Sequence, residues 1–168
     1  KAAPTQLAEL TLEGLIPRKE DKEHRHYRSS THREIFTHLD SEFLPSSPAQ
    51  GPFLELLNSA PAEGLALIQR LVDHAVSALS KGKELNNNGF SLILPAGPRL
   101  FPWGQTYYWS RNANGCYAIE SALMALEAWS HARIERGDGV DQVVSDVLGP
   151  EGSPTAFRSP FFRFAVVA

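Results

Sequence analysis

The sequence predicts an all-α (mainly α) fold, a helical bundle or irregular α-α array of about seven to eight helices. Apolar residues recur three and four positions apart in several segments, which places them on one face of a helix. Proline, serine or a capping box stands at the start of these segments, and glycine or proline follows most of their ends. A proline- and aromatic-rich insertion at 95–110 separates the two longest predicted helices.

The first predicted helix covers 5–16 and stops before Pro17, whose ring does not fit a helix interior. The charged stretch at 18–28 has no apolar stripe and is interpreted as a solvated helix face or a connector. Thr31 and Glu34 then form a capping box, which predicts a second helix with apolar residues on one face.

Prolines mark the next boundaries. A loop at 44–52 contains three prolines and a glycine, so no regular element is expected there. A short helix is predicted from Phe53, and a longer one from Pro61, because a proline in the first helical turn costs no hydrogen bond. Gly82 is the expected stop of the longer helix.

The insertion has no helical period. The segment 90–94 is interpreted as an isolated extended strand or as a buried segment, and 95–110 as a loop with three prolines and five aromatic residues. Helices are predicted again at 117–136 and 139–148, and two Ser-Pro pairs, at 153–154 and 159–160, are typical of helix starts. The predicted core comprises Ile35, Phe36, Leu39, Leu65, Ile68, Val72, Val76, Leu123, Leu126 and Trp129.

Composition excludes several classes of protein. A net charge of −3 is unlike the strongly basic face of a nucleic-acid binder, and the chain has no apolar run of membrane-spanning length. A single cysteine excludes an internal disulfide, which favours a reducing, cytoplasmic location. We expect residues 1–168 to form a single helical domain. The apolar end of the chain, at 159–168, predicts that this domain belongs to a larger protein.

Cys116 is the only candidate nucleophile. A thiolate at the start of the helix at 117–136 would be stabilised by its dipole, with Asn112 or Asn114 near an oxyanion, as in a cysteine hydrolase. The short run around Cys116 loosely resembles the cysteine box of papain-like proteases. However, His131 is the only histidine downstream, and on one continuous helix it would lie about 22 Å away. A small core residue is therefore the preferred interpretation of Cys116.

No cofactor or metal is expected. His24 and His26, followed by His32 and His38, could suggest a metal site. However, His32 and His38 are six positions apart and do not converge on one helix face, and no cysteine joins the histidines. The sequence also lacks the glycine- and lysine-containing phosphate-binding loop of nucleotidases.

The aromatic part of the insertion is the candidate interaction surface, because tryptophan, tyrosine and arginine dominate binding hot spots. An alternative is that its rings cover one end of the helical core. The candidate residues are Arg99, Phe101, Trp103, Tyr107, Tyr108, Trp109 and Arg111.

The runs YYWSRNANGCYAIESALMALEAWSHARIERG, at 107–137, and VVSDVLGPEGSPTAF, at 143–157, resemble a helical region of very large bacterial ATP-binding proteins of the signal-transducing (STAND-like), antiviral type. This resemblance implies a parent that is a defence-type ATPase, and no catalytic residue is carried over from the family to this chain. The sequence thus favours a non-catalytic helical module that contacts other domains of its parent or another protein, without membrane, nucleic acid or metal.

Overall fold

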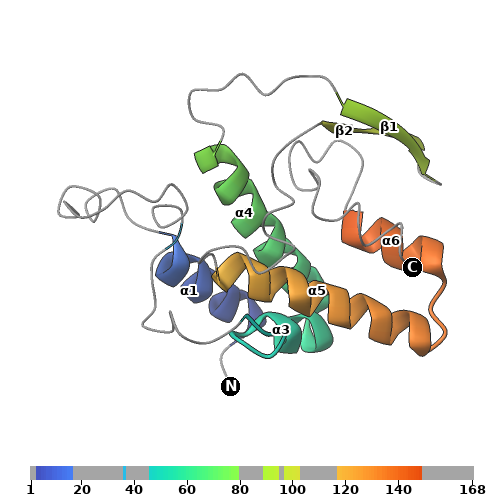
Figure 1. Ribbon diagram of the computed structural model, residues 1–168. Helices are drawn as coiled ribbons and strands as arrows, with labels where there is room; N and C mark the ends of the chain where they lie inside the picture. The colour runs from blue at the N-terminus through green and yellow to red at the C-terminus, as the bar shows by residue number, and fades with distance from the viewer. Residues whose placement is uncertain are drawn as a thin grey trace.

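The computed structural model describes residues 3–16, 36, 46–79, 89–94, 97–102 and 117–148, and this part of the chain is mainly helical (Figure 1). The predicted helical class is therefore confirmed. The described elements are α1 (Pro4–Leu15), α3 (Phe53–Ser59), α4 (Pro61–Leu79), β1 (Gly89–Leu94), β2 (Gly97–Pro102), α5 (Tyr117–Glu135) and α6 (Val140–Leu148).

Helix α1 forms where the sequence predicts it, but its apolar spacing does not identify its buried face. Pro4 occupies the first turn, and the helix ends at Leu15, two residues before Pro17. The side chains of Ala8, Leu12 and Leu15 are buried against the rest of the core. Leu10, which shares the apolar spacing of this helix, points outward and is 63% exposed.

Helices α3 and α4 meet in a tight corner around Ala60. Pro61 begins α4, as predicted from its missing N–H. Gly64 is required at this corner, because a Cβ atom there would lie 2.8 Å from the backbone nitrogen of Leu57. The absence of a side chain therefore lets the first turns of α4 approach the backbone of α3.

Helix α5 ends in a left-handed glycine, as predicted. Gly137 has φ +97°, its N–H donates to the carbonyl of Ile134, and the N–H of Asp138 donates to the carbonyl of Arg133. These two bonds form a Schellman motif, which reverses the chain into α6.

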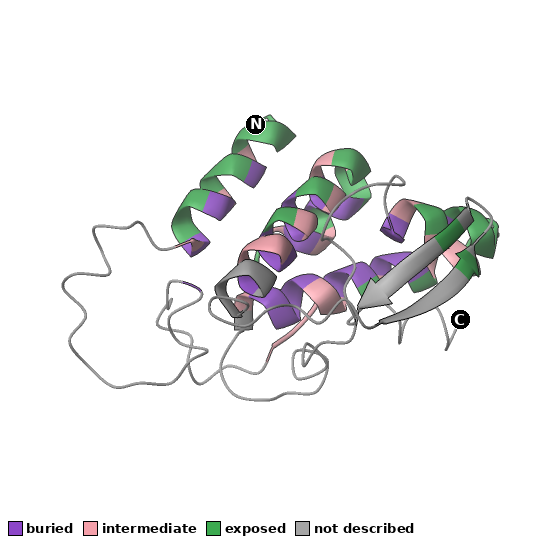
Figure 2. Ribbon diagram, turned by 90° about the horizontal axis from the view of Figure 1, so that it is seen from above, coloured by how far each residue is buried: buried purple, intermediate pink, exposed green. Residues whose placement is uncertain are grey.

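The core lies between α1, α3, α4, α5 and α6. Helix α3 packs on both α4 and α5, while α1 covers α4 and α6 covers α5. Figure 2 shows the buried residues on the inward-facing sides of these helices. The fully buried centre of the core includes Leu56, Leu57, Leu67, Ile68, Leu71, Val72, Ile119, Leu126 and Val143.

Five members of the predicted core are buried: Phe36, Ile68, Val72, Leu126 and Trp129. Leu65 and Leu123 are only half-buried at its margin, which corrects their prediction. The side chains of Ile35, Leu39 and Val76 lie outside the described part, as do the predicted charged stretch at 18–28, the stop at Gly82 and the helix starts after 149.

The insertion between α4 and α5 contains a strand pair, which the all-α prediction did not include. β1 and β2 pair antiparallel in a two-stranded sheet, with Leu94 opposite Gly97 and Gly89 opposite Pro102. The interpretation of 90–94 as a strand is correct. The interpretation of 95–110 as a loop is wrong for Gly97–Pro102, which forms a strand by pairing with β1. The pattern of side chains in this segment does not indicate that pairing.

Candidate functional site

The candidate interaction residues divide into two groups. Arg99 and Phe101 belong to β2, where they pair with Leu92 and Phe90 of β1. The other five, Trp103, Tyr107, Tyr108, Trp109 and Arg111, lie outside the described residues, and so do Asn112, Asn114 and Cys116. The structure therefore places the beginning of the predicted interaction segment on a hairpin.

The hairpin lies outside the packed helices. Figure 1 shows β1 and β2 beyond the helical layer, above α6 in that view. Among the described elements, the extensive contacts of each strand are with the other strand. A two-stranded hairpin is marginally stable alone in water, so additional packing partners would stabilise it.

Ile93 near the tip of this hairpin is 90% exposed. The other large apolar side chains that are exposed in the described part are Leu10, at 63%, and Val140, at 43%. Opposite Ile93 lies Pro98, which is also exposed. Sequence reasoning left open a buried role for 90–94, because a short apolar run bounded by Gly and Pro occurs in buried strands as well.

A second feature is a polar cluster between the loop before α3 and the first turns of α5. The hydroxyl of Ser46 donates to Oε2 of Glu120 at 2.7 Å, and the hydroxyl of Ser121 donates to Oε1 of Gln50 at 2.8 Å. The N–H of Ser47 donates to the Ser121 hydroxyl at 3.3 Å. These bonds join segments about seventy positions apart in the sequence, so the cluster holds the loop 46–52 on α5.

Glu120 is the unusual member of this cluster. Its side chain is 5% exposed, and its Oε1 atom has no hydrogen-bond partner within the part of the chain that the structure describes. Its position in the first turn of α5 is favourable for a negative charge, because the N-terminal end of a helix dipole is positive. Glu120 was not singled out from the sequence, where an acidic residue in a first helical turn is unremarkable.

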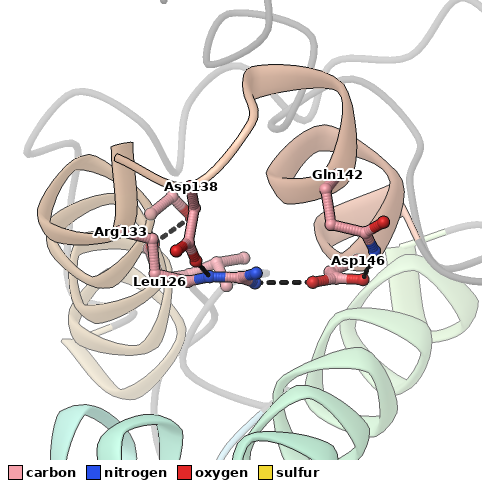
Figure 3. A network of polar contacts seen from close by, with 6 residues as sticks. Leu126, Arg133, Asp138, Gln142 and Asp146 are labelled. Atoms are coloured by element: carbon pink, nitrogen blue, oxygen red, sulfur yellow. Dashed lines mark hydrogen bonds and ion pairs between the residues drawn. The ribbon is translucent and has the colours of Figure 1, made fainter. Parts of the chain in front are cut away.

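Arg133 links α5 to α6 (Figure 3). Its Nε donates to Asp138 at 2.5 Å and its Nη1 donates to Asp146 at 2.6 Å, while Gln142 donates to the second oxygen of Asp146. The guanidinium also lies 4.8 Å from the centroid of the Trp129 ring. Burial by itself lowers the pKa of Arg133. The hydrogen bonds to Asp146 and Asp138 and the negative charges of these residues outweigh this effect, so the pKa is raised above its usual value.

This network is structural in its chemistry. Both carboxylates and the guanidinium are engaged with one another, and the Arg133 side chain is only 15% exposed. The arrangement joins the end of α5 to α6 through two ion pairs of Arg133.

The two described histidines lie on different helices. His131 lies on α5, which is continuous from Tyr117, the residue after Cys116. The distance from Cys116 to His131 was estimated on the assumption of one continuous helix, and α5 is continuous from Tyr117 to His131. At 1.5 Å per residue, His131 lies about 21 Å along the axis from Tyr117. His74 lies on α4, where its ring is 5.7 Å from that of Phe36.

Within the described ranges, no group of three histidine, cysteine, aspartate or glutamate side chains could hold a metal ion. A search of the same residues finds no helix with the length and apolar character needed to cross a membrane.

No known family model matches the chain, and no curated protein or solved structure is significantly similar to it.

Proposed function

We propose that the chain is a non-catalytic helical module that makes protein–protein or interdomain contacts through its β1–β2 hairpin and the aromatic segment that follows. The observation that carries this proposal is the 90% exposure of Ile93 on a hairpin whose extensive contacts, among the described elements, are between its own two strands. The helices form a packed core, and Ile93 is exposed on the hairpin.

The physical argument concerns the stability of the hairpin. A two-stranded hairpin by itself gains little from burial, and the exposed Ile93 side chain contributes nothing to the core. A partner that covers this surface would bury apolar area and satisfy open strand edges, which is the usual mode of β-augmentation. The neighbouring Arg99 and Phe101 belong to residue types that are common in binding surfaces.

The nature of the parent follows from the resemblance. If the chain is a region of a larger bacterial, cytoplasmic ATPase of the antiviral type, the partner of the hairpin is another domain of that protein or one of its targets. The full helix count of seven to eight is part of the same proposal, with further helices at 31–43 and after Ser153 and Ser159.

The test compares two charge substitutions at exposed apolar positions. Ile93→Asp alters the hairpin and Leu10→Asp alters α1, and each should change the free energy of unfolding by no more than about 0.5 kcal/mol. Cross-linking in the expressing cell, followed by mass spectrometry, should give contacts that disappear in Ile93→Asp and persist in Leu10→Asp. Cross-links that are identical in both variants would show that the hairpin is not the contact surface.

A further inference from the structure

The two outer edges of the hairpin differ in their capacity to accept another strand. Two residues, Pro95 and Ala96, separate Leu94 from Gly97, and such a connection closes on a residue couple that exchanges both hydrogen bonds. Hydrogen-bonded and non-hydrogen-bonded couples alternate along an antiparallel pair. The non-hydrogen-bonded couples of this hairpin are therefore Gly89–Pro102, Ser91–Leu100 and Ile93–Pro98. The backbone N–H and C=O groups of these residues point away from the hairpin.

On β2 this outer edge is blocked. Two of its three outward residues, Pro98 and Pro102, have no N–H group, and proline on an edge strand is a known obstacle to strand addition. On β1 all three outward residues, Gly89, Ser91 and Ile93, keep their N–H groups. Within the described residues the sheet has no third strand, and the outer edge of β1, unlike that of β2, keeps every outward N–H group.

The three outward residues of β1 are spaced symmetrically about Ser91. If two copies of β1 pair antiparallel around a two-fold axis through Ser91, then Ser91 faces its own copy and Gly89 faces Ile93 of the other chain. Each of these couples exchanges two backbone hydrogen bonds. A register shifted by one pair in either direction leaves one outward residue without a partner.

The residues in this register are compatible with each other. No charged residue occurs in Gly89–Leu94, so like charges do not face each other across the two-fold axis. The β-branched Ile93, which is 90% exposed, faces Gly89, which has no side chain to obstruct it. The prolines of β2 terminate the sheet on both outer sides, so that pairing closes at four strands and does not continue into a fibre.

We infer that this chain forms a homodimer by antiparallel pairing of β1 with β1 of a second copy, centred on Ser91, which gives a four-stranded sheet. The inference rests on the proposed function, because it names the partner of the hairpin as a second copy of this chain. It commits the open backbone edge of β1 to that partner, whereas β2 and the aromatic segment are left for contacts with other proteins.

The test uses two proline substitutions in the full chain. Ser91→Pro and Leu100→Pro lie opposite each other, and each removes only an outward N–H, so both should leave the hairpin intact. Sedimentation equilibrium should show a dimer for the unaltered chain and for Leu100→Pro, and at least a tenfold weaker dimer for Ser91→Pro. A monomer for the unaltered chain, or equal behaviour of the two variants, would overturn the inference.

A second measurement does not depend on tolerance of a new proline. In the Cys116→Ser background, Ser91→Cys places two thiols across the two-fold axis, where a Cα separation of about 5.5 Å suits a disulfide. Mild oxidation should give a covalent dimer with Ser91→Cys and none with Leu100→Cys. If neither forms while cross-links to other proteins still depend on Ile93, the homodimer is wrong and the interaction module stands.

Discussion

The sharpest stability prediction concerns the same substitution at two helical glycines. At Gly64 an added Cβ would meet the α3 backbone at three points: 2.8 Å from N and 3.0 Å from Cα of Leu57, and 3.1 Å from the carbonyl carbon of Leu56. These atoms belong to a helix backbone and cannot move aside as a flexible side-chain end could. At Gly14 in α1, nothing lies within 4 Å of the added atom.

The two effects can be separated by magnitude. Replacing a helical glycine with alanine stabilises a helix by up to about 1 kcal/mol, because glycine loses more backbone entropy on folding. Overpacking in a close contact costs about 1–3 kcal/mol, and the distance of 2.8 Å places Gly64→Ala at the high end. The expected net change is a loss of about 2 kcal/mol for Gly64→Ala and a gain of up to about 1 kcal/mol for Gly14→Ala.

The assay is urea unfolding of the full chain, followed by far-UV circular dichroism. In thermal unfolding, the Gly64→Ala loss corresponds to a decrease in Tm of roughly 4–8 °C for a domain of this size. Gly14→Ala serves as the matched control, since it makes the same chemical change without the contact. Equal or greater stability of Gly64→Ala would refute the close approach of α3 and α4.

Two further predictions concern Arg133 and Cys116. Arg133→Met should lower the free energy of unfolding by about 1–3 kcal/mol, because the bonds to Asp138 and Asp146 are lost. In the same urea experiment the control Arg70→Met, which breaks the exposed pair with Glu9, should lower it by at most about 1 kcal/mol. Because the pKa of Arg133 is raised on folding, its contribution is complete at neutral pH and is lost only in strongly alkaline solution, so the difference between Arg133→Met and the unaltered chain should be constant from about pH 6 to pH 9. Iodoacetamide should label Cys116 much more slowly in the folded chain than in urea, as expected for a core residue; rapid labelling of the folded chain would favour the nucleophile.

The helix boundaries were predictable because they depend on single residues and their own backbone. Pro61 begins α4 and Gly137 ends α5 in the structure, and both positions follow from what proline and glycine allow locally. The sequence was less informative about which side of a helix is buried. Helix α5 has apolar or small residues on most of its circumference, so the burial of Ala125 and the half-burial of Leu123 depend on where α3 and α6 pack.

The candidate site was predictable only in part for a related reason. Aromatic and arginine residues in 95–111 indicated an interaction segment, and Arg99 and Phe101 do belong to the hairpin. The exposed Ile93 was not identified, because exposure of an apolar residue is a property of the packed molecule. The buried Glu120 was missed likewise, since its partner Ser46 lies 74 positions away in the sequence.

The sequence by itself determined the mainly helical class and helix boundaries such as Pro61 and Gly137, because helical hydrogen bonds and caps join residues within one or two turns. Only the tertiary structure decided the strand pair, the faces that are buried, and the polar cluster around Glu120. Each of these depends on contacts between segments that are distant along the chain or on the pairing of two backbones, and no local period of side chains records such contacts.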